Sequence, residues 1–188
     1  MIFFENTLIT VISLSTPLVI AVIGETISEK SGVINLSAEG TIMICALFGF
    51  MFGYITDIAI VGFLFAMLLG AGIAIFISYC DIKLRMDQIA VGFVLTMLLT
   101  QLSNYIGQDY VRINGPIITK IQIPLLSKIP FLGNVLFNHS LITYFSILLI
   151  PSAWFFINKT TLGLHIRSAG ENPLTAYSRG IDVKKMRF

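Results

Sequence analysis

The sequence has few charged residues, and this scarcity decides the class of protein. Only 12% of its 188 residues are Asp, Glu, Lys or Arg, against about 25% in soluble domains. Hydrophobic residues make up 56% of the chain, and the mean hydropathy is +0.89. A water-soluble globular fold is therefore excluded, and the sequence predicts an all-α polytopic protein of the lipid bilayer.

Residues that carry chemistry are also scarce. The chain has two histidines, His139 and His165, and two cysteines. In the topology predicted below the histidines fall on opposite sides of the membrane, so we expect no catalytic site and no metal site. Cys45 lies within a predicted span and Cys80 at the end of another, which predicts free thiols. The chain has no G-x-x-x-x-G-K-[ST] phosphate loop, and we expect no cofactor. A net charge of +2 gives no reason to expect nucleic-acid binding.

Long uncharged runs separate the few charges. Each run can supply the roughly 20 apolar residues that cross a hydrocarbon core of about 30 Å. The runs are continuous rather than alternating, which favours helices over barrel strands. We predict five membrane-spanning helices, near residues 7–23, 36–52, 58–80, 89–106 and 141–157.

The basic residues predict the orientation of these spans, because cytoplasmic loops are enriched in Lys and Arg. With the N-terminus outside and the C-terminus in the cytoplasm, nine of the 12 basic residues are cytoplasmic. These nine are Lys30, Lys83, Arg85, Lys159, Arg167, Arg179, Lys184, Lys185 and Arg187. The other three, Arg112, Lys120 and Lys128, fall outside.

Small residues and one proline predict how the spans pack and bend. Gly49 and Gly53 are four residues apart, as are Gly70 and Ala74, and such pairs let helix backbones approach closely in lipid. Pro17 predicts a kink in the first span, with the nearby Ser13 hydroxyl bonded to a local carbonyl. For residues 109–140, rich in proline and glycine, we expect a segment folded onto the outer face. A disordered loop is the alternative.

The segment between the first two spans, residues 24–40, is polar. Glu25 and Glu29 are spaced to share a helix face, as are Asn35 and Glu39, with Gly32 between the two pairs. In a discontinuous helix, Asn35 and Glu39 would face an aqueous pathway through the bundle. In a plain inner loop they would be solvated groups. The residues alone leave both interpretations open.

A second polar segment follows the last span. Asn172 can cap a helix that Pro173 opens, and Gly180 can close it in a left-handed conformation. Leu174 and Tyr177, three residues apart, share one face of this helix. A helix of two turns needs something to dock against. The alternative is an ordinary surface turn.

Four motifs in this order resemble the permeases of the branched-chain amino acid and simple-sugar ABC importer family, in particular its nucleoside-type branch. The first is the run SGVINL at 31–36, followed by AEG at 38–40. The second is Asp87-Gln88 with Gly92, and the third is IPLLSKIP at 123–130. The fourth comprises TLGL at 161–164, GENP at 170–173 and GI at 180–181.

The resemblance implies a function for both polar segments. It implies a bacterial inner-membrane permease subunit that forms part of a solute pathway for nucleosides or related sugars. The pathway residues would be Glu25, Asn35 and Glu39. A cytoplasmic coupling helix would dock in a groove of a separate ATPase subunit, using Gly170, Glu171, Asn172, Pro173, Leu174, Tyr177 and Gly180. Further partners would be a second permease subunit and an extracytoplasmic solute-binding protein.

The resemblance also has departures. Ser37, Thr96 and Thr175 stand where the family usually or often has glycine, asparagine and alanine, which leaves the solute open. Family members continue through further spans, so we expect residues 1–188 to form a single transmembrane permease domain, the N-terminal part of a longer permease. A truncated, non-transporting scaffold is the first alternative. An intramembrane enzyme using Glu25, Glu29 or Glu39 is the second, for which the sequence offers no nucleophile or metal ligands at one depth.

Overall fold

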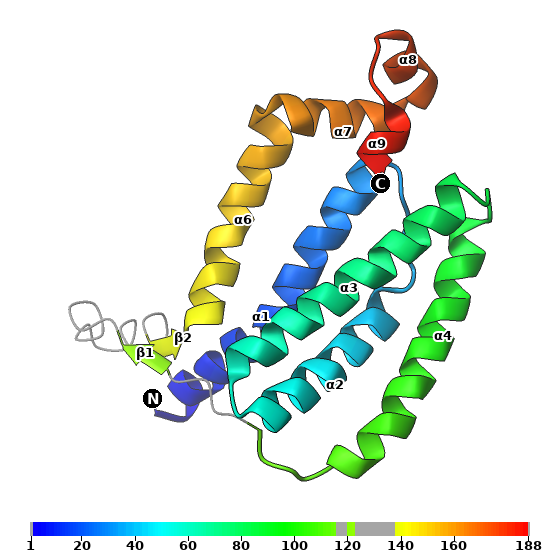
Figure 1. Cartoon of the computed structure of the whole chain (residues 1–188). Helices are drawn as coiled ribbons and strands as arrows, with labels where there is room; N and C mark the ends of the chain where they lie inside the picture. The colour runs from blue at the N-terminus through cyan, green and yellow to red at the C-terminus, as the bar shows by residue number, and fades with distance from the viewer. Residues whose placement is uncertain (1, 116–119, 123–137, 188) are drawn as a thin grey trace. The chain divides into compact units, whose positions relative to one another are not determined.

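The computed structural model describes residues 2–115, 120–122 and 138–187 (Figure 1). In this part of the chain, five helices are long and apolar enough to cross a membrane. They are α1 (Ile2–Lys30), α2 (Ala38–Thr56), α3 (Ala59–Ile82), α4 (Gln88–Gly107) and α6 (Leu141–Lys159). The predicted all-α fold with five spans is confirmed, and the chain is a multi-pass membrane protein.

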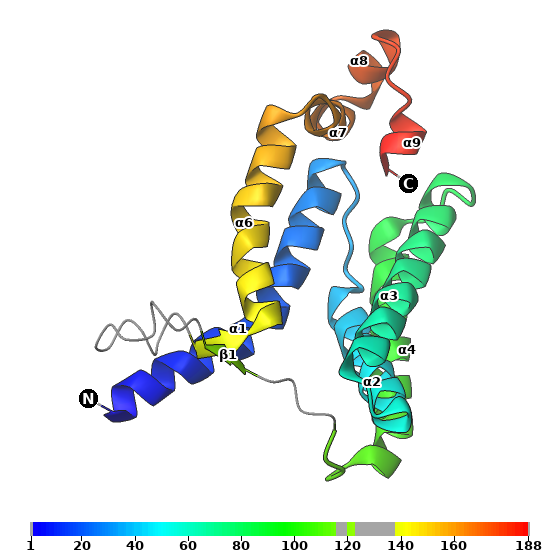
Figure 2. The same cartoon turned by 60° about the vertical axis from the view of Figure 1, so that its left-hand side comes forward.

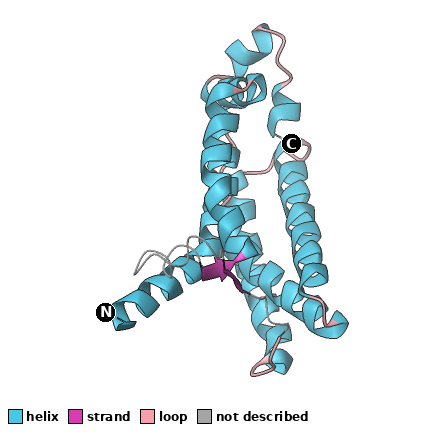
Figure 3. Cartoon of the chain, turned by 90° about the vertical axis from the view of Figure 1, so that its left-hand side faces the viewer, coloured by secondary structure: helices cyan, strands magenta, loops and turns pink. Residues whose placement is uncertain are grey.

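Shorter elements complete the described part. They are the 3-10 turn η1 (Gln108–Tyr110) and the helices α7 (Thr161–Glu171), α8 (Pro173–Ser178) and α9 (Val183–Arg187). Strands β1 (Lys120–Gln122) and β2 (Asn138–Ser140) form a short antiparallel pair, drawn in magenta in Figure 3. Residues 116–119 and 123–137, which make up more than half of the segment expected to fold onto the outer face, lie outside the described residues.

The chain divides into two compact units, which we describe separately. The first takes in Met1–Gly24 and Ile118–Thr160. Within it, α1 changes direction partway along its length (Figure 2). The helix contains Pro17, which lacks an N–H for the backbone ladder and crowds the carbonyl one turn earlier. The predicted kink therefore has a direct physical cause.

Polar side chains stabilise the first unit near this proline. Thr16 Oγ1 donates to the Ile12 carbonyl and to Thr143 Oγ1 on α6, both at 3.1 Å. Ser13 Oγ lies 3.2 Å from Nδ1 of the buried His139. The local back-bond expected of Ser13 is thus made by Thr16, and Ser13 is directed to β2 instead.

In the second unit, Glu25–Ile117 and Thr161–Phe188, helices α2 and α3 meet through glycines. A Cβ on Gly62 of α3 would lie 2.9 Å from the Gly53 nitrogen and would overlap the Gly49 carbonyl oxygen. Because lipid gives no hydrophobic drive for helix association, such close backbone packing holds the pair together. The predicted role of Gly49 and Gly53 in helix packing is confirmed.

Helix α4 packs on α2 along its other side. A Cβ on Gly40 would lie 2.8 Å from the Thr96 carbonyl oxygen. Farther along, Ser103 Oγ donates to the Met43 carbonyl at 3.2 Å. The buried face of α4 therefore points to α2, and this fixes which α4 residues face away.

Candidate functional site

The polar segment between α1 and α2 is a break between two helices. Helix α1 continues to Lys30, so Glu25 and Glu29 lie on its last two turns. Gly32 then adopts a φ of 84°, which ends the helix, and α2 begins only at Ala38. Residues 31–37 are therefore not helical.

Asn35 lies in this break, so the prediction that Asn35 and Glu39 share a helix face is wrong. The Asn35 Oδ1 accepts hydrogen bonds from the Ser37 N–H at 3.0 Å and from Ser37 Oγ at 2.6 Å. Asparagine side chains offer nearby N–H groups an alternative to helix bonds. Asn35 thereby holds the chain in a turn, and the helix starts after it.

The structure brings two of the three predicted pathway residues together. The Asn35 N–H donates to Glu25 Oε1 at 3.2 Å, and both residues are half-buried. Glu39 is exposed in the first turn of α2. Among the residues that the structure describes, no hydrogen bond links Glu39 to the other two.

Helix α4 satisfies the backbone of the break, which the sequence did not reveal. Thr96 Oγ1 donates to the Leu36 carbonyl at 2.6 Å, and the Ile34 N–H donates to Gln88 Oε1 at 3.0 Å. A Cβ on Gly92 would lie 3.1 Å from Leu36. Backbone groups inside a membrane must find partners in the protein or line water. Polar and small residues at the start of α4 were the available signal.

Helices α7 and α9 pack against the same break. A Cβ on Gly170 of α7 would overlap the Lys30 carbonyl oxygen and would lie 2.9 Å from the Gly32 nitrogen. Arg187 Nε donates to the Ser31 carbonyl at 3.3 Å, and Ser78 Oγ donates to the Arg187 carbonyl at 3.2 Å. The polar tail is therefore anchored directly where α1 ends.

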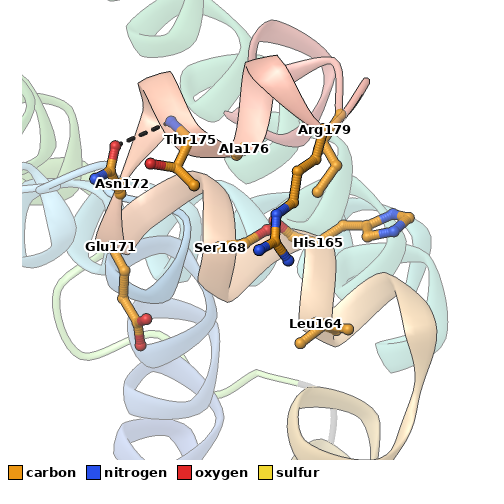
Figure 4. Close-up of a pocket in the computed structure, with 9 residues that line it drawn as sticks. Leu164, His165, Ser168, Glu171, Asn172, Thr175, Ala176 and Arg179 are labelled. Atoms are coloured by element: carbon orange, nitrogen blue, oxygen red, sulfur yellow. Dashed lines mark hydrogen bonds between the residues drawn. The ribbon is translucent and has the colours of Figure 1, made fainter.

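Helix α8 has the predicted caps at both ends. The Asn172 Oδ1 accepts from the Thr175 N–H at 3.0 Å (Figure 4). Pro173 occupies the first turn. Gly180, with a φ of 82°, takes the left-handed conformation after the helix. The predicted capped helix is confirmed.

One side of α8 is fixed to α7, and the other faces outward. Ala176 is 2% exposed, whereas Leu174 and Tyr177 are 83% and 75% exposed.

An open pocket of about 460 Å³ lies where α8 meets α7. Figure 4 shows Arg179 reaching back toward Ser168 of α7. The pocket is lined by Leu164, His165, Ser168, Glu171, Asn172, Thr175, Ala176, Arg179 and Ile181.

The histidines and cysteines lie apart from one another. No group of three His, Cys, Asp or Glu side chains that could hold a metal ion occurs within residues 2–115, 120–122 and 138–187. His139 is buried in the first unit, and His165 lines the pocket beneath α8 in the second. Cys45 and Cys80 are free thiols, as predicted.

Known proteins match the chain along most of its length. The family model described as "Branched-chain amino acid transport system / permease component" matches residues 7–188. Guanosine ABC transporter permease protein NupQ of Bacillus subtilis is 36% identical over 189 residues, which cover 93% of this chain and 58% of the relative. Nucleoside ABC transporter permease protein NupC of Lactococcus lactis is 34% identical, with the same coverage of both chains.

A third relative matches to a similar extent. The putative glucose ABC transporter permease protein TsgC13 of Haloferax volcanii is 32% identical over 178 residues, which cover 93% of this chain and 54% of the relative. The chain thus spans a little more than half the length of the curated relatives that it matches. No solved structure matches the chain.

Proposed function

The chain belongs to the branched-chain amino acid transport system permease family, and from this we propose that it forms part of the translocation pathway of an ABC importer for nucleosides or related sugars. It does no chemistry itself, and a separate ATPase subunit hydrolyses ATP. A second permease subunit and an extracytoplasmic solute-binding protein complete the transporter in the inner membrane. The names of the relatives support this class of solute.

The observation that carries the proposal is the outward face of α8. Leu174 and Tyr177 are large, apolar and almost fully exposed on a helix that follows the last membrane span. Exposed apolar residues gathered in this way mark protein interfaces. The face docks the ATPase subunit, and Gly170, Glu171, Asn172, Pro173 and Gly180 position it.

The break between α1 and α2 is the proposed pathway element. Non-helical backbone at membrane depth is tolerated where it is buried in protein or lines water. Glu25 and Asn35 meet here, and a carboxylate carried to the bilayer centre costs about 2.5–3.5 kcal/mol on insertion scales unless it is hydrated or paired. Together with Glu39 they face the aqueous path, where uncharged solutes can hydrogen-bond to them.

A chain of contacts within the second unit connects the two elements. The buried Ala176 packs α8 against α7, and Gly170 of α7 packs against Lys30 and Gly32. Because packed backbones transmit displacement rather than absorb it, a movement of α8 reaches the break that holds Asn35. Closure of the ATPase subunits would in this way drive the change between outward-open and inward-open forms.

The test is the interaction of α8 with the ATPase subunit. Leu174→Asp together with Tyr177→Asp should abolish co-purification of the ATPase with the assembled transporter, because each substitution places a charge in an apolar interface. Membrane insertion should be unchanged, since both residues lie outside the spans. The matched control, Leu174→Ile with Tyr177→Phe, keeps the apolar surface and should retain the ATPase. Undiminished co-purification with the double aspartate variant would contradict the proposal.

The proposed orientation has its own test. A membrane-impermeant thiol reagent applied to intact cells should label Asp109→Cys, beyond the end of α4, and should not label Arg179→Cys. Both residues are exposed, so access to the reagent depends on the side of the membrane. The opposite labelling pattern would reverse the topology.

A further inference from the structure

Three exposed amide side chains lie along one face of α4 and of the η1 turn that continues it. Gln101, Asn104 and Gln108 follow at intervals of three and four residues, which places them on one stripe of a helix. The opposite face is buried toward α2 and contains Gly92, Leu99 and Ser103. We call Gln101, Asn104 and Gln108 the amide stripe. It points away from the α2 contact that holds α4 in the second unit.

The stripe begins deep in the membrane. The span that contains it, Gln88–Tyr110, has 23 residues, so Leu99 is its midpoint. At about 1.5 Å per residue, Gln101 lies about 3 Å from that midpoint. Within the part of the chain that the structure describes, the three amide side chains have no hydrogen-bond partner. An amide without a partner is unfavourable in hydrocarbon, so water or polar groups must meet this stripe.

Helix α3 of the same unit has the exposed surface expected of a helix that faces lipid. From Ala59 to Cys80 its exposed residues are apolar or glycine, with the Tyr79 hydroxyl as the polar exception near the end. The large ones include Ile60, Phe63, Leu64, Met67, Leu68, Ile75 and Phe76. No amide occurs among them. Both helices are long and apolar enough to cross a membrane. Of the two, only α4 has amide side chains on its exposed face.

The residues beside the stripe suggest what it contacts. An open groove on α4 is lined by Gln101 and Tyr105 with Val94, Met97, Leu98 and Leu102. Tyr105 is 76% exposed, so its ring offers a flat apolar face next to the Gln101 amide. From Gln88 to Gln108 the chain has no charged residue. A surface of amides and one aromatic ring, without charge, suits an uncharged solute that combines a planar ring with hydroxyl or amide groups.

We infer that the amide stripe of α4, together with Tyr105, lines the aqueous solute pathway and hydrogen-bonds an uncharged, ring-containing solute as it passes. The inference rests on the proposed importer function and adds α4 to the break that holds Glu25 and Asn35. It names residues that the sequence motifs did not select.

Water access along the stripe is the first test. Single cysteines replace Gln101, Asn104 and Gln108 in the assembled transporter, with Cys45 and Cys80 changed to serine. A charged thiosulfonate reagent, added from the side where Tyr110 emerges, should modify them at least about tenfold faster than Phe63→Cys and Leu68→Cys on α3, because the reagent reacts in water and not in lipid. Equal, slow rates would show a lipid-facing stripe and overturn the inference. Cross-linking of the slow cysteines to another subunit would show an interface and overturn it as well.

Solute recognition is the second test, with guanosine as the probe. Gln101→Leu should raise the KM for guanosine uptake about tenfold, the effect of losing one well-placed hydrogen bond. Guanosine should also slow modification of Gln101→Cys. The control, Phe93→Leu, changes an exposed residue of the same helix outside the groove and should leave the KM unchanged. An unchanged KM in Gln101→Leu would refute the recognition role.

Failure of the ATPase to co-purify with the unmodified transporter would refute the importer proposal instead, whatever the rates at which the cysteines are modified.

Discussion

The α2–α3 contact and the break between α1 and α2 hold the second unit together in opposite ways. The first is a contact of glycine backbones, in which Gly62 meets Gly49 and Gly53 without side chains between them. The second consists of hydrogen bonds between side chains and backbone, in which Glu25 accepts from the Asn35 N–H and Thr96 donates to the Leu36 carbonyl. Glycine packing has one close arrangement, whereas hydrogen bonds can exchange partners with water or solute. We call the glycine contact between α2 and α3 the seam. The comparison indicates that the seam is fixed, whereas the break between α1 and α2 can rearrange.

The largest expected effect breaks the seam. Gly62→Leu should prevent stable packing of α3 on α2, because even a Cβ at this position overlaps the Gly49 carbonyl. Overpacking typically costs about 1–3 kcal/mol, and a leucine facing backbone should reach the upper part of that range. Thermal unfolding in detergent, followed by size-exclusion chromatography, measures it.

Gly72→Leu is the matched control for this substitution. Gly72 is in the same helix, and a Cβ there would have no atom within 4 Å. This variant should unfold at nearly the temperature of the unmodified protein. Equal destabilisation of the two variants would mean that the seam does not depend on close backbone approach.

A smaller, functional effect is expected in the break. Asn35→Ala removes the acceptor that holds Ser37, and Glu39→Gln removes a carboxylate at the start of α2. Each should lower solute uptake about tenfold in a reconstituted transporter, the scale of a lost polar interaction. Assembly and basal ATP hydrolysis should remain. Glu29→Gln, exposed on α1, is the control. Unaltered uptake by both variants would move the pathway to other residues.

The smallest effect concerns the bond between α4 and the break. Thr96→Val keeps the shape of the side chain but leaves the Leu36 carbonyl without its 2.6 Å donor. The loss should be about 1 kcal/mol in the free energy of unfolding. Thr96→Ser retains the hydroxyl and should behave as the unmodified protein does. Denaturation of the purified transporter in detergent compares the two, and a serine variant as unstable as the valine variant would rule out the hydrogen bond as the cause.

Features determined by neighbouring residues were predictable from the sequence. The spans follow from uncharged runs, and the caps of α8 follow from Asn172, Pro173 and Gly180, whose backbone preferences act locally. Helix α1 extends beyond its predicted end because Glu25 and Lys30 do not stop a helix, whereas the left-handed Gly32 does.

Features determined by distant residues were not predictable. Asn35 has the right spacing to share a helix face with Glu39, but its bond to Ser37 competes with the helix. Thr96 meets Leu36 across 60 residues of sequence. Nothing in the local pattern pairs Gly62 with Gly49, since the pairing depends on how α2 and α3 cross.

The caps of α8 bear on how fast the proposed subunits assemble. A helix of six residues does not hold its conformation in water, yet Asn172 and Gly180 fix its ends and Ala176 fixes its orientation on α7. The backbone entropy of this segment is thus lost when the chain folds and not when the ATPase arrives. Leu174 and Tyr177 meet the partner already in place, and association at this face proceeds as docking of preformed surfaces, without a local folding step.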